Sequence, residues 1–211
     1  MDGLRQKAVR ILDMLTVRYP GARCELDFNS PFELLVAVIL SAQCTDKRVN
    51  AVTDKLFEIA NTPEDFAKMP QEELEGYIRS CGFFRTKAAA IINTGRDILT
   101  KYGGKVPDNL KDLTALRGVG IKTAKVVLNN VYDQPVIAAD THVFRTARRL
   151  GLSNAKTPDA VSADLENLIP DNYKRDCHHL LIFHGRYCCK SQKPLCGECP
   201  VIGGCSFNGK C

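Results

Sequence analysis

The sequence predicts an all-α protein, and three observations support that fold class. Apolar residues recur at helical spacing along most of the 211 residues, as in Ala8, Ile11, Leu12 and Leu15. Glycine and proline separate these periodic segments. Residues 135–139 are the one brief extended candidate, and no segment alternates convincingly as a strand.

The expected helices follow one another through the whole chain. The first ends at Pro20-Gly21, and Pro31 suits the first turn of the second. Breaks include Asn61-Thr62-Pro63 and Gly103-Gly104. The further helices are expected near 46–60, 71–80, 85–102, 108–116, 121–133, 141–150, 158–168 and 173–188.

Composition narrows the possible functions. The chain has 29 Lys and Arg against 24 Asp and Glu, a formal net charge of +5 that permits a polyanionic partner without demanding one. No apolar run approaches the roughly 20 residues of a membrane span, so we expect no membrane partner. The N-terminus has no apolar signal-peptide region, so we expect a cytoplasmic protein, nucleoid-associated if prokaryotic, with reduced cysteines.

Four cysteines near the C-terminus have ligand spacing, at Cys189, Cys196, Cys199 and Cys205. Four thiolates suit either a [4Fe–4S] cluster or a tetrahedral zinc ion, and Cys188 could replace its neighbour. Lys190 and Lys193 lie in the intervening loop, where lysines can meet phosphates or simply be solvated. The other cysteines are expected to be small hydrophobes or free thiols: Cys24, Cys44, Cys81, Cys177 and Cys211.

The segment LTALRGVGIKTA (113–124) predicts two helices joined by a tight turn at Gly118-Val119-Gly120. Free N–H groups at the start of the second helix form an anion site that fits a phosphate of nucleic acid. Lys122 stands in that first turn, where a cation is disfavoured by the helix dipole. The position is poor for structure but favours a neutral, nucleophilic amine.

Asp140 follows in the segment ADTH (139–142). It is a good N-cap for the helix expected at 141–150. Beside a nucleophilic amine, an ionised carboxylate would also stabilise the positive charge that develops on a sugar when a glycosidic bond breaks. The two roles can coexist in one residue.

Taken together, these motifs resemble the endonuclease III family of helix-hairpin-helix DNA glycosylase/AP lyases over about residues 4–207. The motifs that carry the resemblance are LRGVGIKTA (116–124), ADTH (139–142), LSAQCTD (40–46), CHH (177–179), HGRY (184–187) and the four-cysteine array. The resemblance implies a six-helix barrel over 22–134, with the hairpin at about 108–133. It implies a second helical domain, formed by 1–21 and 135–211, that holds a [4Fe–4S] cluster.

The resemblance also implies roles for individual residues. Cys189 rather than Cys188 would be the first cluster ligand. Lys122 resembles the lysine that forms a Schiff base, and Asp140 the catalytic aspartate. Gln43 resembles the residue that enters the gap left by the flipped base, and Phe83 lies where a leucine usually wedges into the stack. The further residues implied to contact DNA are Gly118, Val119, Gly120, Lys190 and Lys193.

The activity implied is removal of oxidised pyrimidines from duplex DNA, followed by β-elimination at the abasic site, by a monomer acting in base excision repair. One alternative is an adenine or mismatch glycosylase of the same superfamily, which would carry Ser or Tyr at the position of Lys122. Another is a non-catalytic iron–sulfur DNA-binding protein, which would need neither Lys122 nor Asp140.

Overall fold

The computed structural model describes residues 2–209, and the regular structure within that range is helical, with no strand. Cys211 lies outside the described residues. The α-helices are α1 (Asp2–Arg18), α2 (Pro31–Ser41), α3 (Asp46–Phe57), α4 (Pro63–Lys68), α5 (Gln71–Ile78), α6 (Phe84–Tyr102), α7 (Leu110–Ala115), α8 (Ile121–Val131), α9 (Thr141–Leu150), α10 (Pro158–Leu168) and α11 (Asp171–Tyr187). Two short 3₁₀ turns follow, η1 (Cys196–Glu198) and η2 (Ile202–Gly204).

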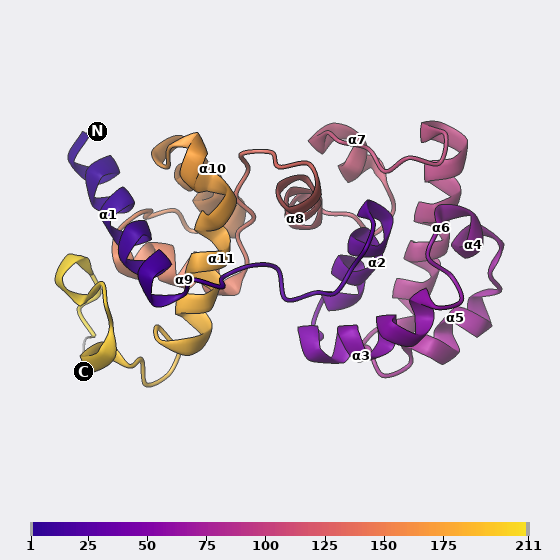
Figure 1. Cartoon of the computed structure of the whole chain (residues 1–211), viewed down its shortest axis with the longest axis horizontal. Helices are drawn as coiled ribbons and strands as arrows, with labels where there is room; N and C mark the ends of the chain where they lie inside the picture. The colour runs from indigo at the N-terminus through magenta and orange to yellow at the C-terminus, as the bar shows by residue number, and fades with distance from the viewer. Residues whose placement is uncertain (1, 210–211) are drawn as a thin grey trace. The chain divides into compact units, whose positions relative to one another are not determined.

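The chain divides into two compact units, and the first joins the two ends of the sequence. It comprises Met1–Arg23 and Asp133–Cys211. In this unit α1 and α9 both pack against α10 and α11 (Figure 1). Leu12 and Leu15 of α1 are fully buried in the resulting core, together with Val161 of α10 and Leu181 of α11. The periodic apolar residues of the N-terminal helix therefore face the C-terminal helices.

The second unit, Cys24–Tyr132, contains α2 to α8. α2 is its central helix, because every residue from Phe32 to Leu40 is buried. It contacts α3, α6 and α8, while α6 also packs against α4 and α5 (Figure 1). Gly95 permits the close contact of α6 with α4, since a Cβ there would lie 2.8 Å from the carbonyl oxygen of Pro63.

The extended candidate at 135–139 does not form a strand in the described chain. Its main-chain groups are bonded by side chains of α10 instead of a neighbouring strand. The N–H of Ile137 donates to Glu166 Oε1 (2.8 Å), and Ser162 Oγ donates to the carbonyl of Ile137 (2.6 Å). Because these groups are satisfied, the segment can be buried without a sheet.

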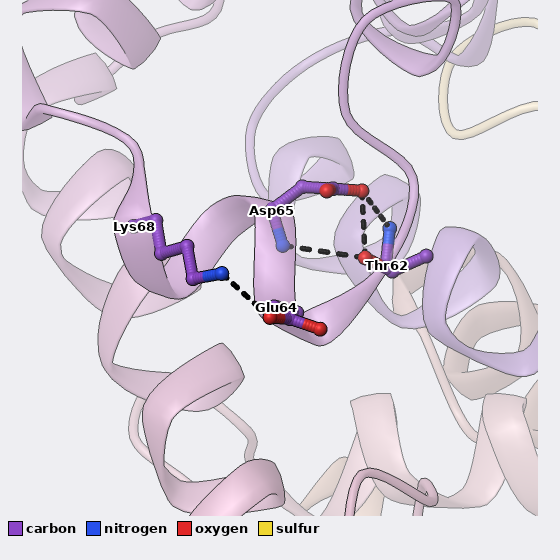
Figure 2. A network of polar contacts seen from close by, with 4 residues as sticks. All are labelled: Thr62, Glu64, Asp65 and Lys68. Atoms are coloured by element: carbon purple, nitrogen blue, oxygen red, sulfur yellow. Dashed lines mark hydrogen bonds and ion pairs between the residues drawn. The ribbon is translucent and has the colours of Figure 1, made fainter.

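The break expected at Asn61-Thr62-Pro63 is present, and it is followed at once by α4, a short helix that was not predicted. Thr62 Oγ1 accepts the N–H of Asp65 (3.2 Å), and Asp65 Oδ2 accepts the N–H of Thr62 (3.0 Å), which completes a capping box (Figure 2). Lys68 pairs with Glu64 one turn later at 2.6 Å. The signal was present in the sequence, since a threonine followed by proline and acidic residues marks a helix start as well as a turn.

Replacing Thr62 by alanine is expected to lower the free energy of unfolding by about 1 kcal/mol, because it removes the cap of α4. Thr62→Ser keeps the hydroxyl and should retain most of that stability.

The hydrogen bond from Thr62 is the main cause that lowers the pKa of Asp65 below its usual 3.8. The stability that Asp65 contributes is therefore full above that value and is lost as the pH falls below it. Urea titrations at pH 7 and pH 3 measure both effects; a Thr62→Ala deficit equally large at both values would contradict this origin.

Candidate functional site

The hairpin predicted from the glycines is formed by α7 and α8, joined by residues 116–120. Gly118 has a φ of 78°, and a Cβ on it would lie 2.7 Å from the Cβ of Ala90 in α6. The carbonyl of Arg117 accepts a hydrogen bond from Thr94 Oγ1 at 2.8 Å, which ties the turn to the same helix. Gly118 is thus required by the fold itself.

Gly120 serves a different purpose in the turn. Its backbone is extended, and nothing lies within 4 Å of the position that a Cβ would occupy. It is the N-cap of α8 but offers no side chain to bind the first N–H groups of that helix. The helix therefore begins with main-chain donors beside open space, as an approaching anion would require.

Lys122 lies in the first turn of α8 and its side chain is exposed. Lys125 and Asn129 follow it at helical spacing in α8, but those two are buried, with 7% and 0% of their surface exposed. Only Lys122 of the three is open to a molecule that approaches the hairpin from solvent.

Asp140 is the N-cap of α9, as its sequence position predicted. A single carboxylate oxygen, Oδ1, accepts the N–H groups of His142 and Val143, both at 2.8 Å. This orients the carboxylate at the start of α9, in the first unit, whereas Lys122 belongs to the second.

Gln43 and Phe83 occupy the tips of two loops in the second unit. Both have left-handed backbones, with φ values of 53° and 57°, which are uncommon for residues other than glycine. Gln43 is exposed, and Phe83 leaves 66% of its surface in solvent. The loops lie against each other, because a Cβ on Gly82 would be 3.8 Å from the carbonyl oxygen of Gln43. Exposed side chains carried on a strained backbone are typical of a binding surface.

Lys87 of α6 holds the first of these loops in place. Its buried ammonium donates to the carbonyls of Leu40 (2.8 Å) and Ala42 (2.7 Å) at the end of α2, and burial lowers the pKa of this group.

Lys87→Met is expected to destabilise the protein by about 2 kcal/mol, because two carbonyls lose their donor. Chemical unfolding of this variant beside Lys101→Met, whose lysine is exposed on the same helix, would measure the cost. Equal stability of the two variants would show that the contacts contribute little.

The four predicted cluster ligands lie at the end of the first unit, around α9 and α11. Cys189 follows α11, Cys196 opens η1, Cys199 ends it and Cys205 follows η2. Arg149 of α9 contacts two of them: its guanidinium reaches Cys189 Sγ at 3.6 Å, and Cys205 Sγ donates to its carbonyl at 3.3 Å. Burial raises the pKa of the Cys199 thiol, with Cys205 and Cys189 as further causes.

Four half-buried cysteines are unfavourable as thiolates unless a bound metal centre balances their negative charge. A tetrahedral zinc ion, with zinc–sulfur distances of about 2.3 Å, would hold its sulfur ligands about 3.8 Å from one another. Among the described residues, the group whose possible ligand atoms all lie within 4.8 Å of one another is a different one: His184, Cys188 and Cys199. The four predicted ligands fit a [4Fe–4S] cluster by their chemistry, since four cysteine thiolates are its usual ligand set.

The compact group was not predicted from the sequence, and its members have other partners. His184 is buried, and its two ring nitrogens contact Tyr19 Oη (3.4 Å) and Cys199 Sγ (3.8 Å). Cys188 is buried, and its Sγ donates to the carbonyl of Leu195 at 3.5 Å. His184 therefore has a packing and hydrogen-bonding role beside the predicted ligand Cys199.

Lys190 and Lys193 are both exposed on the loop that follows Cys189. Three arginines of α9 lie behind this loop and line a cavity of about 460 Å³ together with Phe144 and Phe207. The three are Arg145, Arg148 and Arg149. Arg145 donates to the carbonyls of Cys189 (3.0 Å) and Gly185 (2.9 Å).

Arg149 binds the loop that follows Cys189 directly. It donates to the carbonyls of Lys190 (2.7 Å) and Ser191 (3.1 Å), and its guanidinium lies 4.3 Å from the ring centroid of Phe207. Spacing along the chain does not indicate this role, because the partners lie about forty and sixty residues away.

Arg149→Ala is expected to accelerate loss of iron from the isolated protein by about tenfold or more, since the cluster loop loses three donors. Arg148→Ala, which removes a guanidinium stacked on Phe144 at 5.2 Å, is the matched control. The decay of visible absorbance in the presence of a chelator reports both rates, and identical decay would refute the role of Arg149.

Comparison with known proteins agrees with this geometry. Residues 36–171 match the HhH-GPD superfamily of base excision DNA repair proteins, and residues 189–205 match the iron–sulfur binding domain of endonuclease III. The second match begins at Cys189 and excludes Cys188. The chain is 46% identical to endonuclease III of Haemophilus influenzae over 98% of both chains, and 44% identical to that of Escherichia coli K12 with the same coverage.

Solved structures give the same result. A trapped endonuclease III–DNA covalent intermediate matches with a TM-score of 0.91 and 44% identity, covering 96% of this chain and 95% of the other. A thermostable thymine-DNA glycosylase matches with a TM-score of 0.88 and 25% identity over 98% of each chain.

A helix-hairpin-helix fold with a cysteine-bound iron–sulfur site defines a class of DNA base-excision enzymes. Within that class, the chain belongs to the endonuclease III family. It is a bifunctional DNA glycosylase/AP lyase of base excision repair, it binds DNA, and its cofactor is a [4Fe–4S] cluster. The described helices include none long and apolar enough to cross a membrane.

Proposed function

We propose that the substrates are duplexes that contain oxidised pyrimidines or abasic sites, and that Lys122 and Asp140 carry out the chemistry. The observation that carries this proposal is the exposed amine of Lys122 in the first turn of α8, directly after Gly120. A covalent endonuclease III–DNA intermediate has been trapped for a relative 44% identical to this chain. An exposed lysine on the matching hairpin is the nucleophile that such chemistry needs.

In this mechanism the damaged base leaves the stack, at a cost of roughly a few kcal/mol that is smaller for a poorly stacked lesion. Gln43 enters the gap, and Phe83 wedges beside it. The main-chain N–H groups at residues 118–120 and at the start of α8 bind a phosphate. Lys190 and Lys193 bind phosphates from the cluster loop.

The Lys122 amine then attacks C1′ of the sugar as the glycosidic bond breaks. The Asp140 carboxylate stabilises the positive charge on the sugar, using the oxygen that does not cap α9. The resulting Schiff base allows β-elimination, which cuts the strand on the 3′ side. Capping therefore orients the same carboxylate that acts on the sugar.

The [4Fe–4S] cluster would be held by Cys189, Cys196, Cys199 and Cys205. When bound, it supplies a rigid cross-link between the end of α11 and the two 3₁₀ turns. We further propose that the unit Cys24–Tyr132 is the barrel domain, that the other unit is the cluster domain, and that the enzyme acts as a monomer in the cytoplasm.

A panel of single-lesion duplexes tests the substrate class. A thymine-glycol duplex and an abasic duplex should be nicked, whereas an adenine paired with 8-oxoguanine and a G·T mismatch should be left intact. Preferential release of adenine or of mismatched thymine would instead support a sister glycosylase activity. Binding without any cleavage would support the non-catalytic alternative.

A further inference from the structure

Two cysteines that sequence reasoning treated as isolated lie side by side in the second unit. Cys44 is in the loop between α2 and α3, and Cys81 is in the loop between α5 and α6. The loops that carry them lie against each other, since a Cβ on Gly82 would be 3.8 Å from the carbonyl oxygen of Gln43, and Cys44 is close enough to Cys81 to help raise its pKa. Cys81 is fully buried, whereas Cys44 is half-buried and reaches the surface. The fold has thus paired two thiols that are separated by 37 residues in the chain.

The backbone around both thiols is held in place. The N–H of Cys44 donates to the carbonyl of Ser41 (3.0 Å), and that of Cys81 to the carbonyl of Ile78 (2.8 Å). Lys87 anchors the first loop through Ala42, as described above. The two loops are thus fixed beside each other, and such proximity of the two cysteines is the main requirement for a disulfide.

Charged neighbours and burial give the two thiols different roles in disulfide formation. Lys87 lies near both thiols, and Arg48 near Cys81; both cations counter the strong rise that burial causes in the pKa of Cys81, to about 11. The raised pKa keeps Cys81 as a thiol in the reduced protein. Because only Cys44 reaches the surface, it is the thiol that can meet an external reagent, and Cys81 is the one positioned to complete the reaction.

We propose that Cys44 and Cys81 are a redox modification site that forms a reversible disulfide by exchange with a small-molecule disulfide such as oxidised glutathione. The Cys44 thiolate attacks one sulfur of oxidised glutathione, and one glutathione thiolate leaves. The Cys81 thiol gives up its proton and attacks the Cys44 sulfur, which releases the second glutathione. The protein loses two hydrogen atoms, and one glutathione disulfide becomes two glutathione thiols.

The bond would join the two loops that carry Gln43 and Phe83. Forming it fixes the two sulfur atoms at about 2.05 Å from each other, which draws the loops together. Displacements on the order of 1 Å are enough to impair a site that depends on exact placement. Oxidation would therefore weaken engagement of damaged DNA; this consequence, unlike the bond itself, rests on the proposed roles of Gln43 and Phe83.

Peptide mapping of the native holoenzyme tests the bond without any DNA. The enzyme is incubated in glutathione buffers of increasing oxidised fraction, alkylated and digested with trypsin. Cys81 falls in the peptide 80–85 and Cys44 in 24–47, which also contains Cys24. A Cys24→Ser background therefore makes the linkage unambiguous. We expect a dithiothreitol-sensitive 24–47/80–85 pair, with visible absorbance of the cluster unchanged.

The variant Cys81→Ala provides the matched control, because Cys44 should then stop at a stable mixed disulfide with glutathione. A wild-type protein that stops at the same mixed disulfide, or that links Cys81 only after unfolding by urea, would overturn the proposal. Cys44→Ser should leave Cys81 unmodified in the folded enzyme. Modification of Cys81 in that variant would show that it is the accessible thiol and would overturn the assigned order of attack.

Binding to a duplex with an abasic-site analogue tests the consequence. The oxidised enzyme should bind at least about threefold more weakly than the reduced enzyme, with recovery on addition of dithiothreitol and no change in Cys81→Ala. A mapped disulfide without any change in affinity would overturn the effect on DNA binding. A reduced enzyme that fails to bind or cleave any lesion would count against the proposed function instead.

Discussion

Lys122→Gln is expected to abolish the covalent cross-link that borohydride traps on lesion-bearing DNA and to lower strand cleavage by on the order of 10³-fold or more. Glutamine has nearly the length of lysine but no amine that can form a Schiff base. The affinity for an uncleavable duplex should change far less, because the side chain is exposed and lies at the end of a helix rather than in the core.

The control for charge is Lys111→Gln, which removes an exposed lysine from α7 of the same hairpin. That variant should cross-link like the wild type. Gel analysis of borohydride-treated reactions reads out both proteins in one experiment. If Lys122→Gln still cross-linked with wild-type yield, the nucleophile would have to be another amine.

Cys189→Ala is expected to remove most of the iron and the yellow-brown colour from the purified protein, while Cys188→Ala should retain both. The pair is closely matched, because the two cysteines are adjacent and both follow α11. Only Cys189 falls within the matched iron–sulfur domain and contacts Arg149. Iron and sulfide analysis, with the visible spectrum, gives the measurement.

This comparison also separates the two possible ligand sets. If the compact group of His184, Cys188 and Cys199 held the metal, Cys188→Ala would lose it and Cys189→Ala would not. A colourless wild-type protein that contains zinc would contradict the cluster altogether. Loss of the cluster should also destabilise the first unit, since a structural metal centre contributes to folding directly.

Much of the chemistry could be predicted because its signals are local. The Gly-x-Gly turn, a lysine in the first turn of the next helix, an aspartate before α9 and four spaced cysteines are each readable within a few residues. The N-cap geometry of Asp140 and the positive φ of Gly118 agree with those expectations. The short helix α4 is the local element that was not predicted, because a threonine followed by a proline signals a helix start and a turn equally well.

Contacts between distant segments could not be predicted in this way. The sequence places Cys44 and Cys81 in unrelated loops, and nothing in their spacing marks a pair. The same holds for Lys87, whose partners lie more than forty residues earlier, and for Arg149, which donates to the loop that follows α11. Such contacts depend on which helix faces pack together, and spacing along the chain does not encode that choice.

By itself, the sequence determined the helical class, the hairpin, the amine, the carboxylate and the four thiols, because each depends on backbone preferences or ligand chemistry within one short segment. The tertiary structure alone decided that Gly118 is needed against Ala90, that Lys125 and Asn129 are buried, and that two of the three arginines of α9 hold the cluster loop. The physical reason is that burial and long-range hydrogen bonds are properties of packed surfaces, and those surfaces exist only after the helices have assembled.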